Sequence, residues 1–167
     1  MDIILFEKLL LTTAFCCMAS DGKIDKKEIA QIQSMCEKSP LFENLNFTAN
    51  MNTLISEINT KGKDFITDYF ILLKGSFLTQ QEELTLIDFA IKTIQADEII
   101  EYSEIKFFKV IRNSLKISDD NILSVYPEIE QFIEKDIATE YYLEKITNQY
   151  LKVAELPQFE LFSSDIH

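Results

Sequence analysis

Apolar side chains recur every three or four residues along most of this chain, a spacing that predicts α-helices rather than strands. No stretch of useful length alternates apolar and polar residues, as a half-buried strand would. The breaks between the periodic stretches are short, and the 167 residues include only three glycines and three prolines. All-β domains need many turns and are usually richer in both residues. The sequence therefore predicts an all-α fold, a single helical bundle of about seven helices.

The breaks fix the positions of the expected helices. Residues 3–19 are apolar nearly all round, which is typical of a central helix packed on every side. The later helices are expected over residues 26–37, 48–58, 64–73, 79–96 and 102–115, and over 127–154 with Pro127 in the first turn. Apolar residues make up 47% of the chain, enough for a substantial core. We expect residues 1–156 to form one helical domain and residues 157–167 to form a C-terminal tail.

Three local details complete the helix predictions. Ser118 is expected to begin a turn and cap a following helix, and residues 124–126 are expected to form a short turn of their own. The adjacent rings of Phe107 and Phe108 are predicted to point one inward and one partly outward, and the same is predicted for Tyr141 and Tyr142. These aromatic residues are therefore interpreted as core residues, because a nucleic-acid stacking surface would need interleaved basic residues.

Acidic side chains outnumber basic ones by 28 to 16, which gives a net charge of −12. Such a surface repels phosphate backbones and anionic lipids, and no basic patch offsets it. We expect no nucleic-acid partner, whereas cations and basic protein surfaces remain suitable partners. The alternative is that the acidity only keeps the protein soluble.

The unbroken apolar run 9–19 is too short to span a membrane and no signal peptide is recognisable. A cytoplasmic protein without direct membrane insertion is therefore expected.

The cysteines and the single histidine restrict the possible chemistry. Cys16 and Cys17 are adjacent in an apolar stretch, and with Cys36 the chain has three cysteines, an odd number. The only histidine is the last residue, His167. This pattern does not suit a disulfide framework, a four-ligand zinc site or a Cys–His dyad. We interpret the cysteines as small core residues in a reducing compartment.

One motif occurs twice, at an offset of 76 residues (97 − 21). Each copy follows one expected helix and precedes another. The matching pairs are Asp21 and Asp97, Ile24 and Ile100, Asp25 and Glu101, Glu28 and Glu104, and Ile29 and Ile105. The chain therefore contains two similar helix–turn–helix units, with the isoleucines Ile24 and Ile100 suited to fasten each turn to the core.

The acidic residues of the motif have two interpretations. Asp25 followed three residues later by Glu28 has the form of a capping box, which satisfies the first amides of a helix without any ligand. The second copy keeps three acidic positions although Glu101 is a poor N-cap. Three carboxylates in each turn also suit a hard divalent cation. A true EF-hand is not expected, because the first-half ligand positions fall on Cys17 and Ala19.

With the segments 14–29 and 90–105, the sequence resembles the TerB-like family, which carries an Asp-Gly-x-Ile-x-x-x-Glu motif after an apolar helix and repeats it late in the domain. The resemblance covers roughly residues 3–150 and departs at Glu98, where the family usually has glycine. It implies a helical bundle in bacterial stress response, such as tellurite resistance, with no established enzymatic activity; a related domain occurs in a DnaJ-type co-chaperone. It also implies an acidic cation-binding face, which here comprises Asp21, Asp25, Glu28, Asp97, Glu101 and Glu104.

The sequence bears on three classes of function. The sequence favours a non-enzymatic protein-interaction module, with a divalent-cation-binding domain as the alternative. An enzyme is not expected, because a usable histidine, a glycine-rich phosphate loop and a nucleophile motif are missing, and no catalytic or organic-cofactor residues are assigned. In the tail, Phe159, Leu161 and Phe162 form a possible docking strip, unless these side chains pack back on the bundle.

Overall fold

The computed structural model describes residues 3–19, 24, 26–39, 42, 45–96 and 102–127, and within these ranges it contains helices and no strand. The helices, in chain order, are α1 (Ile3–Ala19), α2 (Lys26–Lys38), α3 (Phe47–Lys61), α4 (Lys63–Gly75), α5 (Gln80–Ile94), α6 (Tyr102–Asn113) and α7 (Asp119–Val125). The prediction of an all-α fold is confirmed, and α1 to α6 begin and end within a few residues of the predicted positions.

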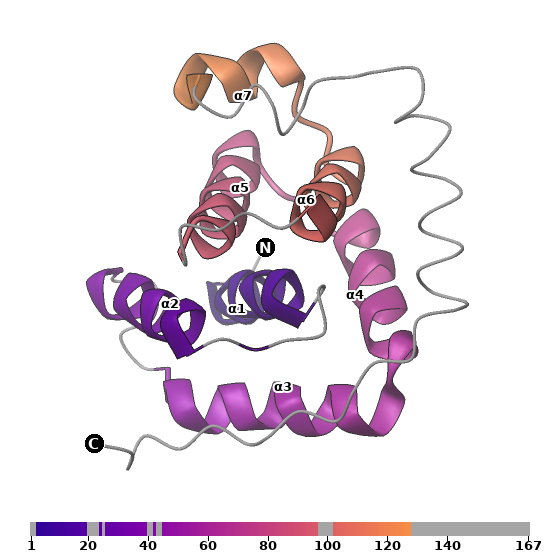
Figure 1. The fold of residues 1–167 in the computed structure, drawn as a ribbon. Helices are drawn as coiled ribbons and strands as arrows, with labels where there is room; N and C mark the ends of the chain where they lie inside the picture. Colours follow the sequence, from indigo (N-terminus) through magenta and orange to yellow (C-terminus); the bar gives the residue numbers. More distant parts are fainter. Residues whose placement is uncertain are drawn as a thin grey trace.

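Helix α1 lies at the centre of the bundle and packs against α2, α3, α4, α5 and α6, most extensively against α5 (Figure 1). Its apolar side chains occupy nearly every position, so no face of it suits water. From Leu9 onward every side chain except Thr12 is buried, including both adjacent cysteines. The predicted central helix is therefore confirmed.

The helix ends follow local chemistry. The Asn46 side chain accepts a hydrogen bond from the Ala49 amide and caps α3. Thr79 and Glu82 form a reciprocal capping box at the start of α5, with N···O distances of 3.1 and 2.9 Å. Between α3 and α4 the backbone reverses at Gly62, whose φ of +60° suits glycine because a Cβ would strain this conformation.

Helix α7 differs from the prediction in its extent. Ser118 is the N-cap, as expected, and its hydroxyl accepts a hydrogen bond from the Asn121 amide. The helix continues to Val125, so the separate turn predicted for residues 124–126 is wrong; Ile122 provides the buried contact that holds this short helix on the bundle. The helix predicted over 127–154 lies, beyond Pro127, outside the described residues, as does the tail 157–167.

Two features of the core also correct the sequence interpretation. Phe107 and Phe108 are both buried, because Phe107 packs against Phe70 of α4 at a ring-centroid distance of 5.3 Å while Phe108 points to the bundle centre. Phe42, in the predicted connector, is buried against Phe89 of α5 at 5.5 Å. Aromatic pairs at these distances stabilise the packing beyond their buried area.

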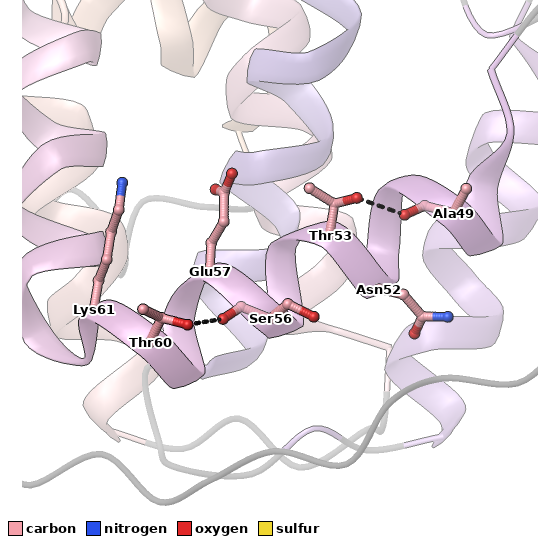
Figure 2. Close-up of a pocket in the computed structure, with 7 residues that line it drawn as sticks. All are labelled: Ala49, Asn52, Thr53, Ser56, Glu57, Thr60 and Lys61. Atoms are coloured by element: carbon pink, nitrogen blue, oxygen red, sulfur yellow. Dashed lines mark hydrogen bonds between the residues drawn. The ribbon is translucent and has the colours of Figure 1, made fainter.

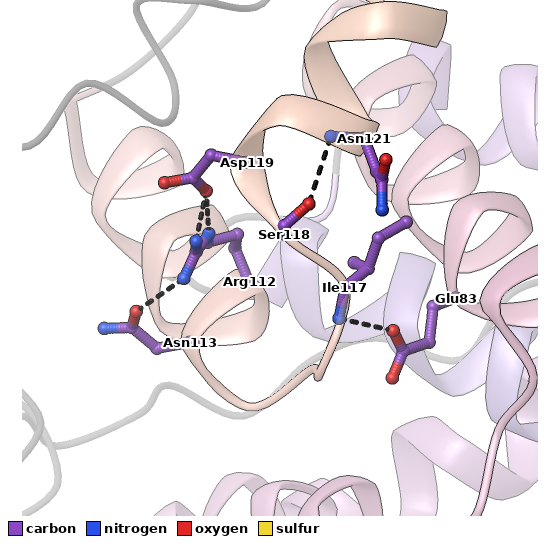
Figure 3. A network of polar contacts seen from close by, with 7 residues as sticks. All are labelled: Glu83, Arg112, Asn113, Ile117, Ser118, Asp119 and Asn121. Carbon is purple, nitrogen blue, oxygen red and sulfur yellow. Dashed lines mark hydrogen bonds and ion pairs between the residues drawn. The ribbon is translucent and has the colours of Figure 1, made fainter.

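A polar network fixes the segment between α6 and α7 (Figure 3). Glu83, buried in α5, accepts hydrogen bonds from the backbone amides of Lys116 and Ile117 at 3.0 and 2.8 Å. Arg112 of α6 forms an ion pair with Asp119 in the first turn of α7, where a carboxylate also suits the helix dipole. These contacts connect three helices across more than thirty residues of sequence.

In the part of the chain that the structure describes, no helix is long and apolar enough to cross a membrane.

Candidate functional site

The structure describes two of the six carboxylates of the repeated motif, Glu28 and Glu104. Helix α2 begins at Lys26 and α6 begins at Tyr102, so both glutamates occupy the third position of their helices. This is the position that a capping box requires. Asp21, Asp25, Asp97 and Glu101 lie outside the described residues. For these two glutamates the repeat is therefore confirmed, because both occupy the same position at the start of a helix.

Both glutamates are buried. Glu28 is 3% exposed and Glu104 is 2% exposed, whereas the carboxylates of most glutamates remain in water. On α2 the buried neighbour of Glu28 is Ile29, the apolar motif residue, which is part of the core. Ile24 and Ile105, the other described isoleucines of the motif, also pack against the core. The motif therefore directs its last acidic residue inward together with its apolar residues.

Both glutamates act electrostatically on one side chain of the central helix, Cys17. Burial, the adjacent Cys16 thiol, and then Glu104 and Glu28 raise the pKa of the Cys17 thiol well above its usual value. Both carboxylates therefore lie close enough to the same buried sulfur to act on it electrostatically. They come from helices 76 residues apart in sequence, so α2 and α6 each place one motif glutamate on the side of α1 that carries Cys17.

Further polar groups continue this buried region along α1 toward α4. The Thr13 hydroxyl donates to the Leu9 carbonyl at 2.8 Å, so the Tyr69 hydroxyl, 2.8 Å away, donates to Thr13. Burial, followed by Cys16 and Cys17, raises the pKa of the Tyr69 phenol well above its usual value. The centre of the bundle thus contains a polar strip of hydroxyl, thiol and carboxyl groups, contributed by α1, α2, α4 and α6.

The described residues do not by themselves complete a metal site. Within residues 3–19, 24, 26–39, 42, 45–96 and 102–127, no three His, Cys, Asp or Glu side chains are placed to hold a metal ion. A cation between Glu28 and Glu104 would therefore need ligands from the turns that precede α2 and α6. Those turns contain the four other carboxylates of the motif.

The sequence analysis missed the position of Cys17 in this arrangement. The cysteine lies in an uninterrupted apolar stretch, and nothing local distinguishes it from its neighbour Cys16. The available signal was helical phase, because Cys17 is four residues from Thr13, whose hydroxyl also needs a partner in the core. The interpretation of the cysteines as buried core residues is confirmed, since all three are buried and none forms a disulfide.

Native protein should resist thiol reagents. Burial, and then the charge of Glu37, raise the pKa of Cys36 to about 12 from 9.0, which leaves about a thousandfold less thiolate near pH 8. Burial raises the pKa values of Cys16 and Cys17 further. We expect a chromogenic disulfide reagent to label none of the three thiols while the chain is folded and all three in denaturant. Rapid labelling of the folded chain would show that the thiols are accessible.

A shallow hollow of about 450 Å³ lies beside the outer face of α3 (Figure 2). All its lining residues come from this one helix: Ala49, Asn52, Thr53, Ser56, Glu57, Thr60 and Lys61. The hydroxyls of Thr53 and Thr60 donate to carbonyls of their own helix, at 2.9 Å each. A cofactor pocket is usually apolar and enclosed by several elements, so this hollow does not match one.

Comparison of the chain with protein-family models, with curated proteins and with solved structures finds no match.

Proposed function

We propose that this protein is a non-enzymatic binding module in which the two copies of the acidic motif bind one divalent cation together. The observation that carries the proposal is the burial of Glu28 and Glu104 at equivalent positions of α2 and α6, both near enough to Cys17 of the central helix to act on it electrostatically. Helix capping accounts for one glutamate at each helix start. It does not account for the burial of both carboxylates near one side of the central helix.

Electrostatics supports a cation at this position. Two buried carboxylates lose hydration, and they repel each other when both are charged. A cation of opposite charge offsets both costs if further oxygen ligands surround it. Calcium takes six to eight oxygen ligands and magnesium six. The preceding turns contribute four more candidates, Asp21, Asp25, Asp97 and Glu101. A hard cation such as Ca²⁺, Mg²⁺ or Mn²⁺ therefore suits this set.

Thermal unfolding of chelator-treated protein tests the proposal. A ligand present at 100 times its dissociation constant stabilises the fold by about 2.7 kcal/mol, which raises Tm by about 5–10 °C for a chain of this length. We expect a rise of this size with one of Ca²⁺, Mg²⁺ or Mn²⁺. The rise should disappear in the Glu28→Gln, Glu104→Gln double variant, which keeps the side-chain volumes and removes both charges.

An exposed acidic pair provides the control. The double variant Glu57→Gln, Asp68→Asn removes two exposed carboxylates of α3 and α4, and it should keep the full cation-dependent rise in Tm. If no cation raises Tm, the proposed site is wrong. If both double variants reduce the rise equally, the cation acts through general surface charge, which also contradicts the proposed site.

A second candidate function is that of a protein-interaction module, which the sequence favours. The observation that supports it is a group of exposed apolar side chains, Ile71 and Leu72 on α4 and Phe77 after it. Solvent-exposed apolar groups of this kind are typical of docking surfaces. A photo-crosslinking amino acid at position 77 is expected to capture a protein in cells that express the chain. The same amino acid at position 5, also exposed and apolar, should capture none.

The biological setting proposed for both functions is the one that the TerB-like resemblance implies, a cytoplasmic bacterial stress or tellurite response. A strain lacking the gene should then be more sensitive to tellurite or to the relevant divalent metal, and the Glu28→Gln, Glu104→Gln variant should fail to restore resistance.

A further inference from the structure

Phe77, together with Ile71 and Leu72, forms the most exposed group of large apolar side chains in the described part of the chain. Their exposed fractions are 83%, 65% and 55%. Ile71 and Gly75 are four positions apart on α4, which is about 6 Å along the helix axis. Two further residues in extended backbone add at most about 7 Å before Phe77. The three side chains, here called the Phe77 surface, therefore lie within about 13 Å along the chain.

Two lysines accompany this surface, and the exposed carboxylate of α4 that is closest to it in sequence, Asp68, is paired with Lys61. The Lys116 ammonium lies over the Phe77 ring, 5.1 Å from its centroid. Lys74, on the last turn of α4, is exposed between Leu72 and Phe77 in sequence. Neither lysine forms an ion pair with a carboxylate of the described residues. In a chain with net charge −12, this combination suits an apolar segment that carries a negative charge.

The chain itself contains such a segment in the tail. Phe159, Leu161 and Phe162 surround Glu160, and residues 157–167 include no lysine or arginine. In extended form, Phe159 to Phe162 covers about 10 Å, close to the length of the Phe77 surface.

We propose that residues 159–162 dock on the Phe77 surface of the same chain, with Glu160 facing Lys116 and Lys74. The chain is long enough for this contact. The 32 residues from Pro127 to Phe159 span about 48 Å even at the rise of a helix, more than the roughly 40 Å diameter of a domain of this length. Because both parts belong to one chain, docking needs no high protein concentration. A partner that binds the Phe77 surface must then displace the tail.

A single tryptophan tests this proposal, because the natural chain has none. In the full-length Phe162→Trp variant, we expect tryptophan emission blue-shifted from that of a free peptide covering residues 156–164 with the same substitution. Quenching by acrylamide should be several-fold weaker than in the peptide. Adding Phe77→Ser should shift the emission to that of the free peptide, and Ile71→Ser should act in the same direction. Both positions are exposed, so the far-UV circular dichroism should not change.

Leu5→Ser is the matched control, since Leu5 is 57% exposed on another helix, and it should leave the emission blue-shifted. Emission like that of the free peptide in the full-length chain would overturn the proposal. So would a blue shift that survives Phe77→Ser, because the tail would then pack elsewhere. A blue shift that appears only as protein concentration rises would show that the tail occupies a second copy, which also contradicts docking within one chain.

This tail contact rests on the second candidate function, the protein-interaction module, and names the segment that occupies the Phe77 surface. The failure of the tail contact can be distinguished from the failure of the protein-interaction function. If the tail docks as proposed, crosslinking from position 77 joins two segments of one chain. If crosslinking joins position 77 only to another protein, the tail proposal is wrong and the protein-interaction function stands.

Discussion

Replacing Phe15 by alanine is expected to lower the free energy of unfolding by about 3–5 kcal/mol, the cost of truncating a buried phenylalanine. Phe15 is fully buried on α1, and its ring meets Phe65 of α4 edge to face at a centroid distance of 5.7 Å. Truncation would leave a cavity beside the central helix and remove this aromatic contact. Because natural domains are stable by about 5–15 kcal/mol, the variant should be close to the limit of folding. Urea unfolding followed by circular dichroism measures the change.

Leu5→Ala, on the same helix, is the control for Phe15→Ala. It truncates an apolar side chain that is 57% exposed, and surface substitutions usually change stability by less than about 0.5 kcal/mol. Similar losses in both variants would mean that α1 is not the centre of the core.

The second large effect is expected at Glu83. Glu83→Ala removes the acceptor of two backbone hydrogen bonds, from Lys116 and Ile117, and leaves the buried Ile117 amide unsatisfied. Hydrogen bonds to a charged group and an unsatisfied buried donor are each worth about 1–3 kcal/mol, so we expect a loss of about 2–4 kcal/mol. Glu83→Gln keeps one carbonyl oxygen and should lose about half as much.

Hydrogen exchange distinguishes a local from a global effect of Glu83→Ala. The Ile117 amide should exchange much faster in the variant under native conditions, while amides in the middle of α1 should change only with global stability. An Ile117 amide that exchanges at the same rate in both proteins would show that Glu83 does not hold the segment before α7.

Local patterns account for most of the fold. Apolar spacing predicted α1 to α6 because each of these helices buries a continuous face, and Ser118 identified the start of α7 through capping chemistry. The burial of Glu83 was not predictable, since its partners are backbone amides 33 and 34 residues away. Phe42 was missed for a similar reason: its partner, Phe89, lies on a distant helix and the surrounding residues have no helical period.

The candidate site was predictable in composition but not in arrangement. The repeat identified Glu28 and Glu104 as equivalent positions, and capping chemistry predicted where each lies on its helix. Their burial near Cys17 depends on how α2 and α6 pack around α1, which no pattern within either motif encodes. A repeat of this kind therefore indicates that two residues take equivalent positions on their own helices. The packing of the helices determines whether the two copies share one site.

Equilibrium dialysis against Ca²⁺ and Mn²⁺ tests most directly whether the two motifs bind a cation together. A shared site predicts one tightly bound ion per chain, and it predicts that Glu28→Gln alone and Glu104→Gln alone each abolish binding. No bound ion would contradict the proposed function. Two ions per chain, each lost with only one of the two substitutions, would contradict the shared site and show that the motifs act separately.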